Sequence, residues 1–275
     1  MKYANNKHVG VINYTGNKQK LLGTLLDLFP DTCDRFIDAC CGGLSVSMSV
    51  PYQRIVSNDI EDRLIEIYKT LEAVGEELSF SEVLNYIGAF DLDNQNKDGY
   101  LELREYYNQE DRSAFVLLTL LYHSFSNQIR FSPDGGFNMA FGRRTFNSSL
   151  QSKLRLFFQF LEAKRPEFTS MSYKEIEVLP TDFLYIDPPY LITDATYNSF
   201  WSPEEDKAMM EWLDSLPCKW GMSNVFHHRG KSNPQLIEWS AKHNTHILSG
   251  VGYVSGAHDS DSRPSKTTEV HICNY

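Results

Sequence analysis

The stretch Phe183-Leu-Tyr-Ile-Asp-Pro-Pro-Tyr190 constrains the fold of this chain more than any other. Its first four residues form a short, aromatic-rich apolar run, which favours a buried strand over a helix. Two consecutive prolines fix φ twice and remove two backbone donors, so the strand has to end at Asp187. Ligands bind at the carboxyl ends of strands in open α/β sheets. The stretch therefore predicts a carboxylate, a proline carbonyl and an aromatic ring at a ligand-binding edge.

The segment Asp187-Pro-Pro-Tyr190 has two open interpretations. The exocyclic amino group of a nucleobase is a poor nucleophile, because its lone pair is delocalised into the ring. The Asp187 carboxylate and the Pro188 carbonyl could accept its two N–H bonds and free the lone pair, while Tyr190 stacks on the flipped base. The alternative is a plain strand-to-loop turn with a stacked tyrosine, and a lone Asp-Pro-Pro motif does not exclude it.

Length and composition are those of a globular protein. The 275 residues can form one large domain or a domain with a subdomain. No apolar run approaches the length needed to span a bilayer and no signal-peptide pattern is present, which predicts a cytoplasmic protein without membrane contact. Five cysteines without C-x-x-C spacing favour reduced thiols over a zinc site, and His227 and His228 are expected to be solvated, so no metal is predicted.

The charge is unevenly distributed. The net charge is −10, yet residues 59–111 hold fifteen acidic and four basic residues, whereas residues 126–165 hold seven basic and two acidic ones. The acidity is local, so a basic face suited to nucleic acid remains possible.

Two further strands are predicted to end in acids. Residues 35–40 read as a strand that leads into Cys41-Gly-Gly43 and a small-residue helix from Leu44. Residues 54–59 are the next strand, and its Asp59 has the spacing from Asp38 of an acid that grips ribose hydroxyls. Asp38 could instead only cap a turn. The full G-x-G-x-x-G is absent, which counts against a dinucleotide oxidoreductase.

A helical block interrupts the α/β pattern. Residues 61–127 read as helices, and Pro133-Asp-Gly-Gly136 predicts the turn of a hairpin or hairpin-like loop within residues 124–147. Arginine, asparagine and glutamine are the side chains that read guanine and adenine edges in the major groove. A solvated hairpin is an equally good interpretation from composition alone. The arms carry Asn127, Gln128, Arg130, Asn138, Arg143 and Arg144.

The chain also resembles a known family. Tyr14-Thr-Gly-Asn-Lys18, the Phe-Ile-Asp strand before Gly42 and Gly43, the acid at Asp59 and the Asp-Pro-Pro-Tyr at 187–190 occur in the order typical of the Dam family of DNA N6-adenine methyltransferases (D12 class), and the likeness is greatest to its bacteriophage branch. It runs over nearly the whole chain. It implies a doubly wound, Rossmann-like α/β methyltransferase sheet made of residues 1–60 and 148–275, and a helical, hairpin-bearing DNA target-recognition domain at 61–147.

The resemblance also implies partners and site residues. The methyl donor would be S-adenosylmethionine, the product S-adenosylhomocysteine, and the substrate an adenine in double-stranded DNA, usually in GATC, bound by a monomer or weak dimer. The catalytic residues would be Asp187, Pro188, Pro189 and Tyr190. The cofactor-binding residues would be Tyr14, Lys18, Asp38, Cys41, Gly42, Gly43, Asp59, Ile60, Tyr173, Asp187 and Tyr197. The DNA-binding residues would be Phe125, Ser126, Asn127, Gln128, Arg130, Asn138, Ala140, Arg143 and Arg144.

Three positions, in the glycine turn and in the hairpin, depart from the family pattern. Cys40 stands where an aromatic residue is usual, which predicts a looser cofactor pocket. Ala140 replaces a proline of the hairpin and Ser132 stands where asparagine is common, which predicts a freer backbone at the recognition arm.

The expected reaction is a direct transfer in which Asp187 orients the amine and accepts its proton, without a covalent intermediate on cysteine. The open alternatives are methylation of cytosine N4, RNA adenine or protein glutamine, and a catalytically silent DNA-binding or cofactor-sensing protein.

Overall fold

The computed structural model describes residues 10–14, 16–193, 201–248 and 267–275. In this part of the chain, one sheet of eight strands has the order β3-β2-β1-β4-β5-β8-β7, with β6 paired to β5. The strands are β1 (Phe36–Asp38), β2 (Ile55–Asn58), β3 (Glu167–Thr169), β4 (Phe183–Ile186), β5 (Lys219–His228), β6 (Lys231–Ser232), β7 (Asn244–Ile247) and β8 (Thr267–Cys273).

The sheet is mostly parallel. β1 pairs in parallel with β2 on one side and β4 on the other, and β2–β3 and β4–β5 are also parallel. β8 lies antiparallel between β5 and β7. The strand order reverses between β1 and β4, the switch point where doubly wound sheets bind ligands. The predicted fold class is confirmed.

Helices cover both faces of the sheet because side chains alternate along each strand. Phe183 and Tyr185 of β4 pack in one hydrophobic cluster with α1 (Leu22–Leu28). Leu184 and Ile186 pack in a second cluster with α7 (Pro203–Ser215) and α8 (Pro234–Ser240). The short buried strand expected over Phe183–Ile186 is therefore observed, with both faces in the core.

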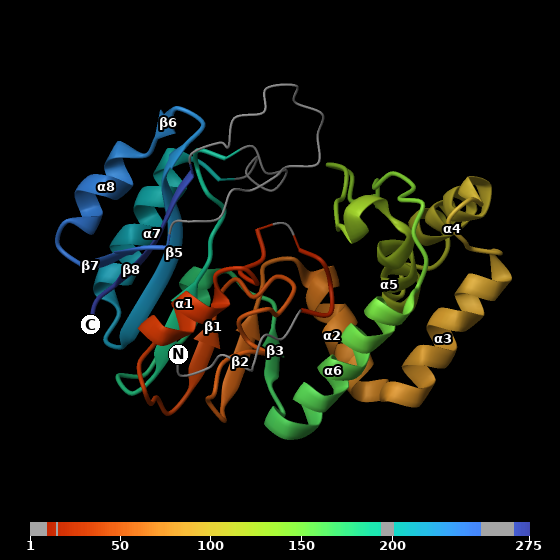
Figure 1. The fold of residues 1–275 in the computed structure, drawn as a ribbon, viewed down its shortest axis with the longest axis horizontal. Coiled ribbons are helices and arrows are strands. Elements are labelled where there is room, and N and C mark those ends of the chain that lie inside the picture. Colours follow the sequence, from red (N-terminus) through yellow and green to blue (C-terminus); the bar gives the residue numbers. More distant parts are fainter. Residues whose placement is uncertain (1–9, 15, 194–200, 249–266) are drawn as a thin grey trace.

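The predicted helical block follows β2. It contains α2 (Asp62–Val74), α3 (Glu76–Ala89), α4 (Lys97–Gln109) and α5 (Ala114–His123), and it leads through a short 3-10 helix, η1 (Phe125–Asn127), to α6 (Ser148–Lys164). Helices α3, α4 and α5 lie at the end of the molecule remote from β5, β8 and β7 (Figure 1). The block shares one hydrophobic cluster with β1, β3 and β4, so its packing is continuous with the sheet. The predicted boundaries of a separate target-recognition domain, at residues 61 and 147, stay a prediction.

The helix expected from Leu44 is wrong. Residues 40–49 form a series of turns, and Leu44 has a φ of 66°. The Ser47 hydroxyl donates to Asp38 at 2.7 Å and accepts from the Ser57 hydroxyl at 2.8 Å. Serine side chains compete in this way with helical hydrogen bonding. The turns therefore place Ser47 where its hydroxyl can donate a hydrogen bond to Asp38, at the end of β1.

The predicted hairpin is a hairpin-like loop with little ladder. Its bridges are Phe131–Phe137 and Ser124–Phe141, both antiparallel, and the Ser132 amide donates to the Gly136 carbonyl across the Pro-Asp-Gly-Gly turn. No helix in the described part of the chain is both long and apolar enough to cross a membrane.

Candidate active site

The register of the sheet brings three acids to one edge. Asp38 lies level with Ser57 of β2 and Tyr185 of β4. Asp59 comes two residues after Ser57, and Asp187 comes two residues after Tyr185. Both acids therefore lie just beyond Asp38 in the direction of the parallel strands. All three line a single cavity of about 820 Å³, which is within the roughly 300–1,000 Å³ of small-molecule sites. The edge predicted from three strand ends is thus one continuous pocket.

Most of the predicted site residues line this pocket. Thirteen of the residues predicted for catalysis or cofactor binding line it: Tyr14, Lys18, Asp38, Cys41, Gly42, Gly43, Asp59, Ile60, Tyr173, Asp187, Pro188, Pro189 and Tyr190. One residue predicted to bind DNA, Arg130, lines it as well. Tyr197 lies outside the described residues. The pocket also includes Phe131, Ser132, Pro133 and Gly135 of the hairpin-like loop. The loop therefore forms one wall of the pocket that contains Asp187.

The glycine turn is shaped by close approach of backbone. Gly42 has a φ of 45°, and a Cβ there would lie 2.8 Å from the Tyr14 ring. A Cβ on Gly43 would lie 2.3 Å from the Ile12 carbonyl oxygen. The Tyr68 hydroxyl donates to the Gly42 carbonyl at 2.6 Å, and this fixes the turn from α2. Glycine is required here so that the chain before α1 can close over the turn.

Asp38 and Asp59 are buried carboxylates that face the pocket. Burial raises the pKa of Asp38 to about 7, and the hydrogen bond from Ser47 opposes this only partly. Burial raises the pKa of Asp59 to about 6, opposed by the amides of Glu61 and Gly42, which donate at 3.0 and 2.9 Å. Both carboxylates are poised to gain a cationic or hydroxyl-bearing ligand, which would favour their ionised forms.

The neighbouring thiols are unreactive. Burial is the main cause that raises the pKa of Cys40 and of Cys41 well above the ordinary thiol value. Protonated thiols are weak nucleophiles. Cys40, the residue that departs from the family's aromatic, lines the pocket without filling it.

Apolar side chains form the outer walls. Ile60 is 72% exposed beside Asp59, a position suited to covering a flat ring. Tyr173 is buried, its ring packs edge-on against Trp212 at 5.0 Å, and its hydroxyl donates to Glu205 of α7 at 2.8 Å. Tyr173 begins the 3-10 helix η2 (Tyr173–Glu175).

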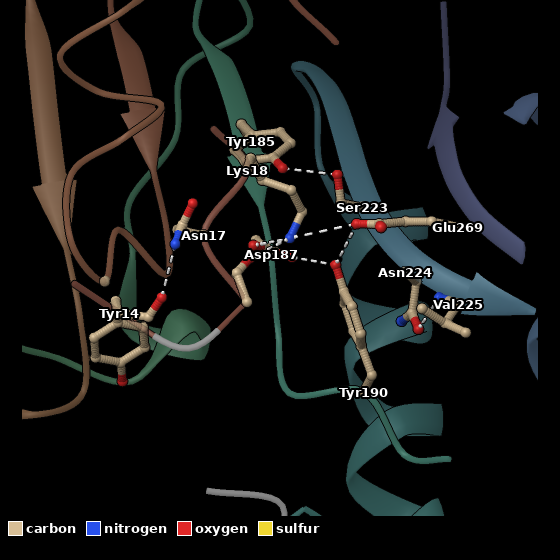
Figure 2. A network of polar contacts seen from close by, with 12 residues as sticks. Tyr14, Asn17, Lys18, Tyr185, Asp187, Tyr190, Ser223, Asn224, Val225 and Glu269 are labelled. Atoms are coloured by element: carbon tan, nitrogen blue, oxygen red, sulfur yellow. Dashed lines mark hydrogen bonds and ion pairs between the residues drawn. The ribbon is translucent and has the colours of Figure 1, made fainter. Parts of the chain in front are cut away.

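The Asp-Pro-Pro-Tyr segment leaves β4 at the pocket floor. The Lys18 ammonium donates to Asp187 Oδ2 at 2.5 Å and to the Gly16 carbonyl at 3.0 Å. The Tyr190 hydroxyl donates to Asp187 Oδ1 at 2.7 Å. The Pro188 carbonyl accepts no hydrogen bond from the described residues. Asp187 and Pro188 therefore offer two acceptors in sequence. Figure 2 shows the first of them, Asp187, bound by Lys18.

The loop residues predicted to bind DNA divide into three groups. Arg143 and Ala140 line a second, shallower hollow of about 730 Å³ with Asn94, Gln95 and Lys97. The Arg130 guanidinium donates to the Asn138 side chain and carbonyl at 2.7 and 2.8 Å, which holds it across the loop. The side chains outside both cavities are Phe125, Ser126, Asn127, Gln128, Asn138 and Arg144.

Asn127 has a structural task in this conformation. Its amide donates to the carbonyls of Leu121 and Tyr122 at 3.1 and 2.8 Å, and the side chain is buried. These bonds add to the capping of carbonyls at the end of α5, where the Leu121 carbonyl also accepts from the Ser124 amide and hydroxyl. By contrast, Phe125 is 52% exposed, and Arg143 and Arg144 are exposed. A DNA contact by any of these residues stays a prediction.

The backbone at Ala140 is held despite the missing proline. The Ala140 carbonyl accepts from the Phe125 amide at 2.8 Å, and a Cβ on Gly142 would lie 2.0 Å from the Ser124 carbonyl oxygen. Cross-loop contacts thus restrain the arm that the substitution was expected to free.

Two charged residues near the pocket escaped sequence analysis. Arg63 of α2 lies 3.3 Å above the centre of the Phe131 ring and donates to the Gly135 carbonyl at 3.0 Å, so it ties the loop to the helix after Asp59. Glu269 of β8 lies 3.6 Å from the Lys18 ammonium. Glu269 follows two threonines in the sequence, and no local pattern there signals its place beside Lys18. Among the described residues, no group of three or more His, Cys, Asp or Glu side chains could hold a metal ion.

Comparison with known proteins gives consistent matches. The sequence profile of the D12 class N6 adenine-specific DNA methyltransferases matches residues 14–254. The chain is 32% identical to the type II methyltransferase M.FokI of Planomicrobium okeanokoites, over 100% of this chain and 44% of that protein. It is 30% identical to the modification methylase StsI of Streptococcus sanguinis, over 96% of this chain and 42% of that protein. The chain thus spans less than half the length of these two relatives.

More distant relatives include shorter and phage enzymes. A DNA adenine methylase of Vibrio cholerae is 27% identical over 70% of each chain. The DNA N-6-adenine-methyltransferase of Escherichia phage P1 is 27% identical over 66% of this chain and 24% of that protein. The predicted family, including a phage representative, is confirmed.

Proposed function

The chain belongs to the family of D12 class N6 adenine-specific DNA methyltransferases, and we propose that it transfers a methyl group from S-adenosylmethionine to N6 of an adenine in duplex DNA. The proposal rests mainly on one observation: a single cavity contains both the hydrogen-bond acceptors of Asp187 and Pro188 and the two buried carboxylates of Asp38 and Asp59.

The pocket suits the methyl donor in charge and volume. When bound, S-adenosylmethionine supplies an electrophilic methyl group on a cationic sulfur. Asp38 and the Gly42 turn would hold its amino-acid part, Asp59 would accept from the ribose hydroxyls, and Ile60 would cover the flat base. Tyr14 is held over the glycine turn and closes the pocket on the side of α1. The product is S-adenosylhomocysteine.

The acceptors at the end of β4 suit an amino nucleophile. The carboxylate of Asp187 and the carbonyl of Pro188 each accept one N–H of the adenine amino group, which turns its lone pair toward the methyl group. Asp187 then accepts the proton that the nitrogen loses as it gains positive charge. The adenine reaches this site only when flipped out of the duplex, and Tyr190 lies where its ring can cover the base.

The raised pKa values of Asp38 and Asp59 predict pH-dependent cofactor binding. Without ligand, burial favours the neutral forms, so the stability these groups contribute is full below their ordinary value of 3.8 and is lost as pH rises through about 6 and 7. A cationic, hydroxyl-bearing ligand requires the ionised forms. Affinity for S-adenosylmethionine should therefore rise about tenfold or more from pH 5.5 to 8, as measured by calorimetry in two buffers of different ionisation enthalpy.

The matched variant for this titration is Asp38→Asn. It cannot ionise, so its affinity should be weaker at pH 8 and should depend less on pH. An affinity in the natural protein that is the same at both pH values, with no proton release, would contradict the assignment of these two carboxylates.

The hairpin-like loop is proposed to select the target. Its exposed arginines lie on the segment that forms one wall of the pocket, and GATC, the usual target of the resembled family, is the first candidate sequence. The proposal is tested with tritiated S-adenosylmethionine and two duplexes, one with GATC and one with the same bases shuffled. Label in the first duplex alone supports both parts of the proposal. Label in both keeps the chemistry and removes GATC as the target. Label in neither, with cofactor bound, rejects GATC and moves the substrate to RNA, protein or another DNA sequence.

Arg144 is expected to contribute to sequence discrimination. Replacement by alanine should reduce the ratio of rates on preferred and single-substituted duplexes by about tenfold, since one lost base contact costs roughly 1–3 kcal/mol. Arg54→Ala, an exposed arginine just before β2 at the opposite end of the strands, is the control and should leave the ratio unchanged. An equal loss of affinity for all sequences would make Arg144 a phosphate contact instead.

A further inference from the structure

Glu269 extends the site beyond the Asp-Pro-Pro-Tyr segment. It lies on β8, opposite Val225 of β5, and approaches Asp187 from the antiparallel side of the sheet. Its Oε1 atom is 3.6 Å from the Lys18 ammonium and 3.4 Å from the Tyr190 hydroxyl. The side chains of Lys18 and Glu269 are only 2% and 6% exposed. Figure 2 shows the four side chains of Lys18, Asp187, Tyr190 and Glu269 joined in one network.

The hydrogen bonds of this network occupy Asp187. Oδ2 accepts from Lys18 and Oδ1 accepts from Tyr190. A donor already bound to Oδ1 weakens that oxygen as an acceptor for the amino group of a substrate. The proposed reaction, however, requires Asp187 both to orient the amine and to accept its proton. Each carboxylate oxygen has two lone pairs, so the amine can bind beside these donors, but release of one donor would make Asp187 a stronger acceptor for the amine.

Tyr190 is the donor that has an alternative. Its hydroxyl carries a single proton and can donate to only one acceptor at a time. Glu269 Oε1 is the second acceptor within reach, at 3.4 Å against 2.7 Å for Asp187 Oδ1. Burial raises the pKa of Tyr190 well above its ordinary value, with the charge of Asp187 adding to the effect, so the hydroxyl stays protonated and remains a donor.

Lys18 is the donor that has to stay. Its ammonium lies between the carboxylates of Asp187 and Glu269 and is bonded to the Gly16 carbonyl as well. Without a cation between them, the buried carboxylate of Glu269 and the partly buried carboxylate of Asp187 would repel each other. Lys18 therefore lets Glu269 stand close to Asp187.

We propose that Glu269 is a positioning residue that takes over the hydrogen bond of the Tyr190 hydroxyl when the amino substrate reaches Asp187, and so releases Asp187 Oδ1 for that substrate. The exchange moves a hydrogen bond and transfers no proton between residues. This inference rests on the proposed methyl transfer to an amino group.

The test uses single-turnover methyl transfer, because slow product release would hide a change in the chemical step. Glu269→Leu removes the second acceptor and should lower the single-turnover rate by about 10- to 100-fold, the range expected for one hydrogen bond of roughly 1–3 kcal/mol. The dissociation constants for DNA and S-adenosylmethionine should stay within about threefold of the natural values. Glu269→Gln, whose amide oxygen can accept from Tyr190, should recover most of the rate.

Tyr190→Phe distinguishes this role from a purely structural one. It keeps the aromatic ring, removes the hydroxyl that competes for Asp187, and should retain at least about a tenth of the rate. In this background Glu269→Leu should have little further effect, because no hydrogen bond is left to hand over.

Three results would overturn the inference: equal losses from Glu269→Leu with and without the Tyr190 hydroxyl, no recovery with glutamine in a folded protein that binds both ligands, or an inactive Tyr190→Phe variant. Circular dichroism and cofactor binding verify folding of each variant. Failure of the natural protein to methylate DNA would instead reject the proposed function on which the inference rests.

Discussion

Replacement of Asp187 by alanine should abolish methyl transfer while the protein stays folded. The variant loses the acceptor that orients the amine and takes its proton, effects that together are worth about 10³-fold or more. Folding should survive, because Lys18 keeps the Glu269 carboxylate and the Gly16 carbonyl as partners. The measurement is the single-turnover rate with saturating S-adenosylmethionine, beside a thermal melt.

Asp214→Ala is the matched control for this loss. Asp214 also pairs with a lysine, Lys242, but it lies on α7 in a surface cluster with Trp239 and His243, outside the pocket. Its replacement should leave the rate within about twofold. A single-turnover rate above a tenth of the natural value in Asp187→Ala would contradict the assignment of Asp187 to the active site.

Replacement of Lys18 by methionine should produce the largest loss of stability. The methionine fills much of the volume but leaves the Asp187 and Glu269 carboxylates without the cation between them. Breaking a buried ion pair by removing one partner costs roughly 3–5 kcal/mol. Urea unfolding at pH 8 should therefore show a loss of about 3 kcal/mol or more.

The pH dependence of this loss identifies its cause. The uncompensated carboxylates can take up protons as pH falls, so the loss should be smaller at pH 5 than at pH 8. Lys18→Met combined with Glu269→Gln removes one of the two carboxylates and should recover part of the stability at pH 8. A loss that is the same at both pH values and in the double variant would indicate a packing defect, not an electrostatic one.

The meeting of Asp38, Asp59 and Asp187 in one pocket could be predicted from sequence because each strand ends in its own chemical signal. The apolar run at Phe183–Ile186 and the prolines after it define a strand and its end locally, and the same holds for the acids Asp38 and Asp59. Parallel pairing then brings such ends together whatever the rest of the chain does.

Local signals misled where a side chain serves the tertiary structure. The small residues after Leu44 suit a helix, yet Ser47 is bonded to Asp38 and Ser57, and the segment turns instead. The course of the chain after β1 is thus set by the tertiary contacts of Ser47, which residue type alone does not reveal.

Glu269 and Arg63 could not be predicted because their roles depend on distant pairings. β8 joins the sheet between β5 and β7 in antiparallel fashion, and that insertion alone brings Glu269 to Lys18 and Tyr190. Arg63 meets Phe131 only because the hairpin-like loop folds back onto α2. No local pattern in either segment encodes these neighbours.

The most direct measurement is the identity of the methylated nucleoside. Duplex DNA containing GATC, treated with the protein and labelled S-adenosylmethionine, is digested to nucleosides and analysed by mass spectrometry, with Asp187→Ala in parallel. The proposed chemistry predicts labelled N6-methyldeoxyadenosine from the natural protein and none from the variant. Label on cytosine N4, or equal adenine label from both proteins, would contradict it.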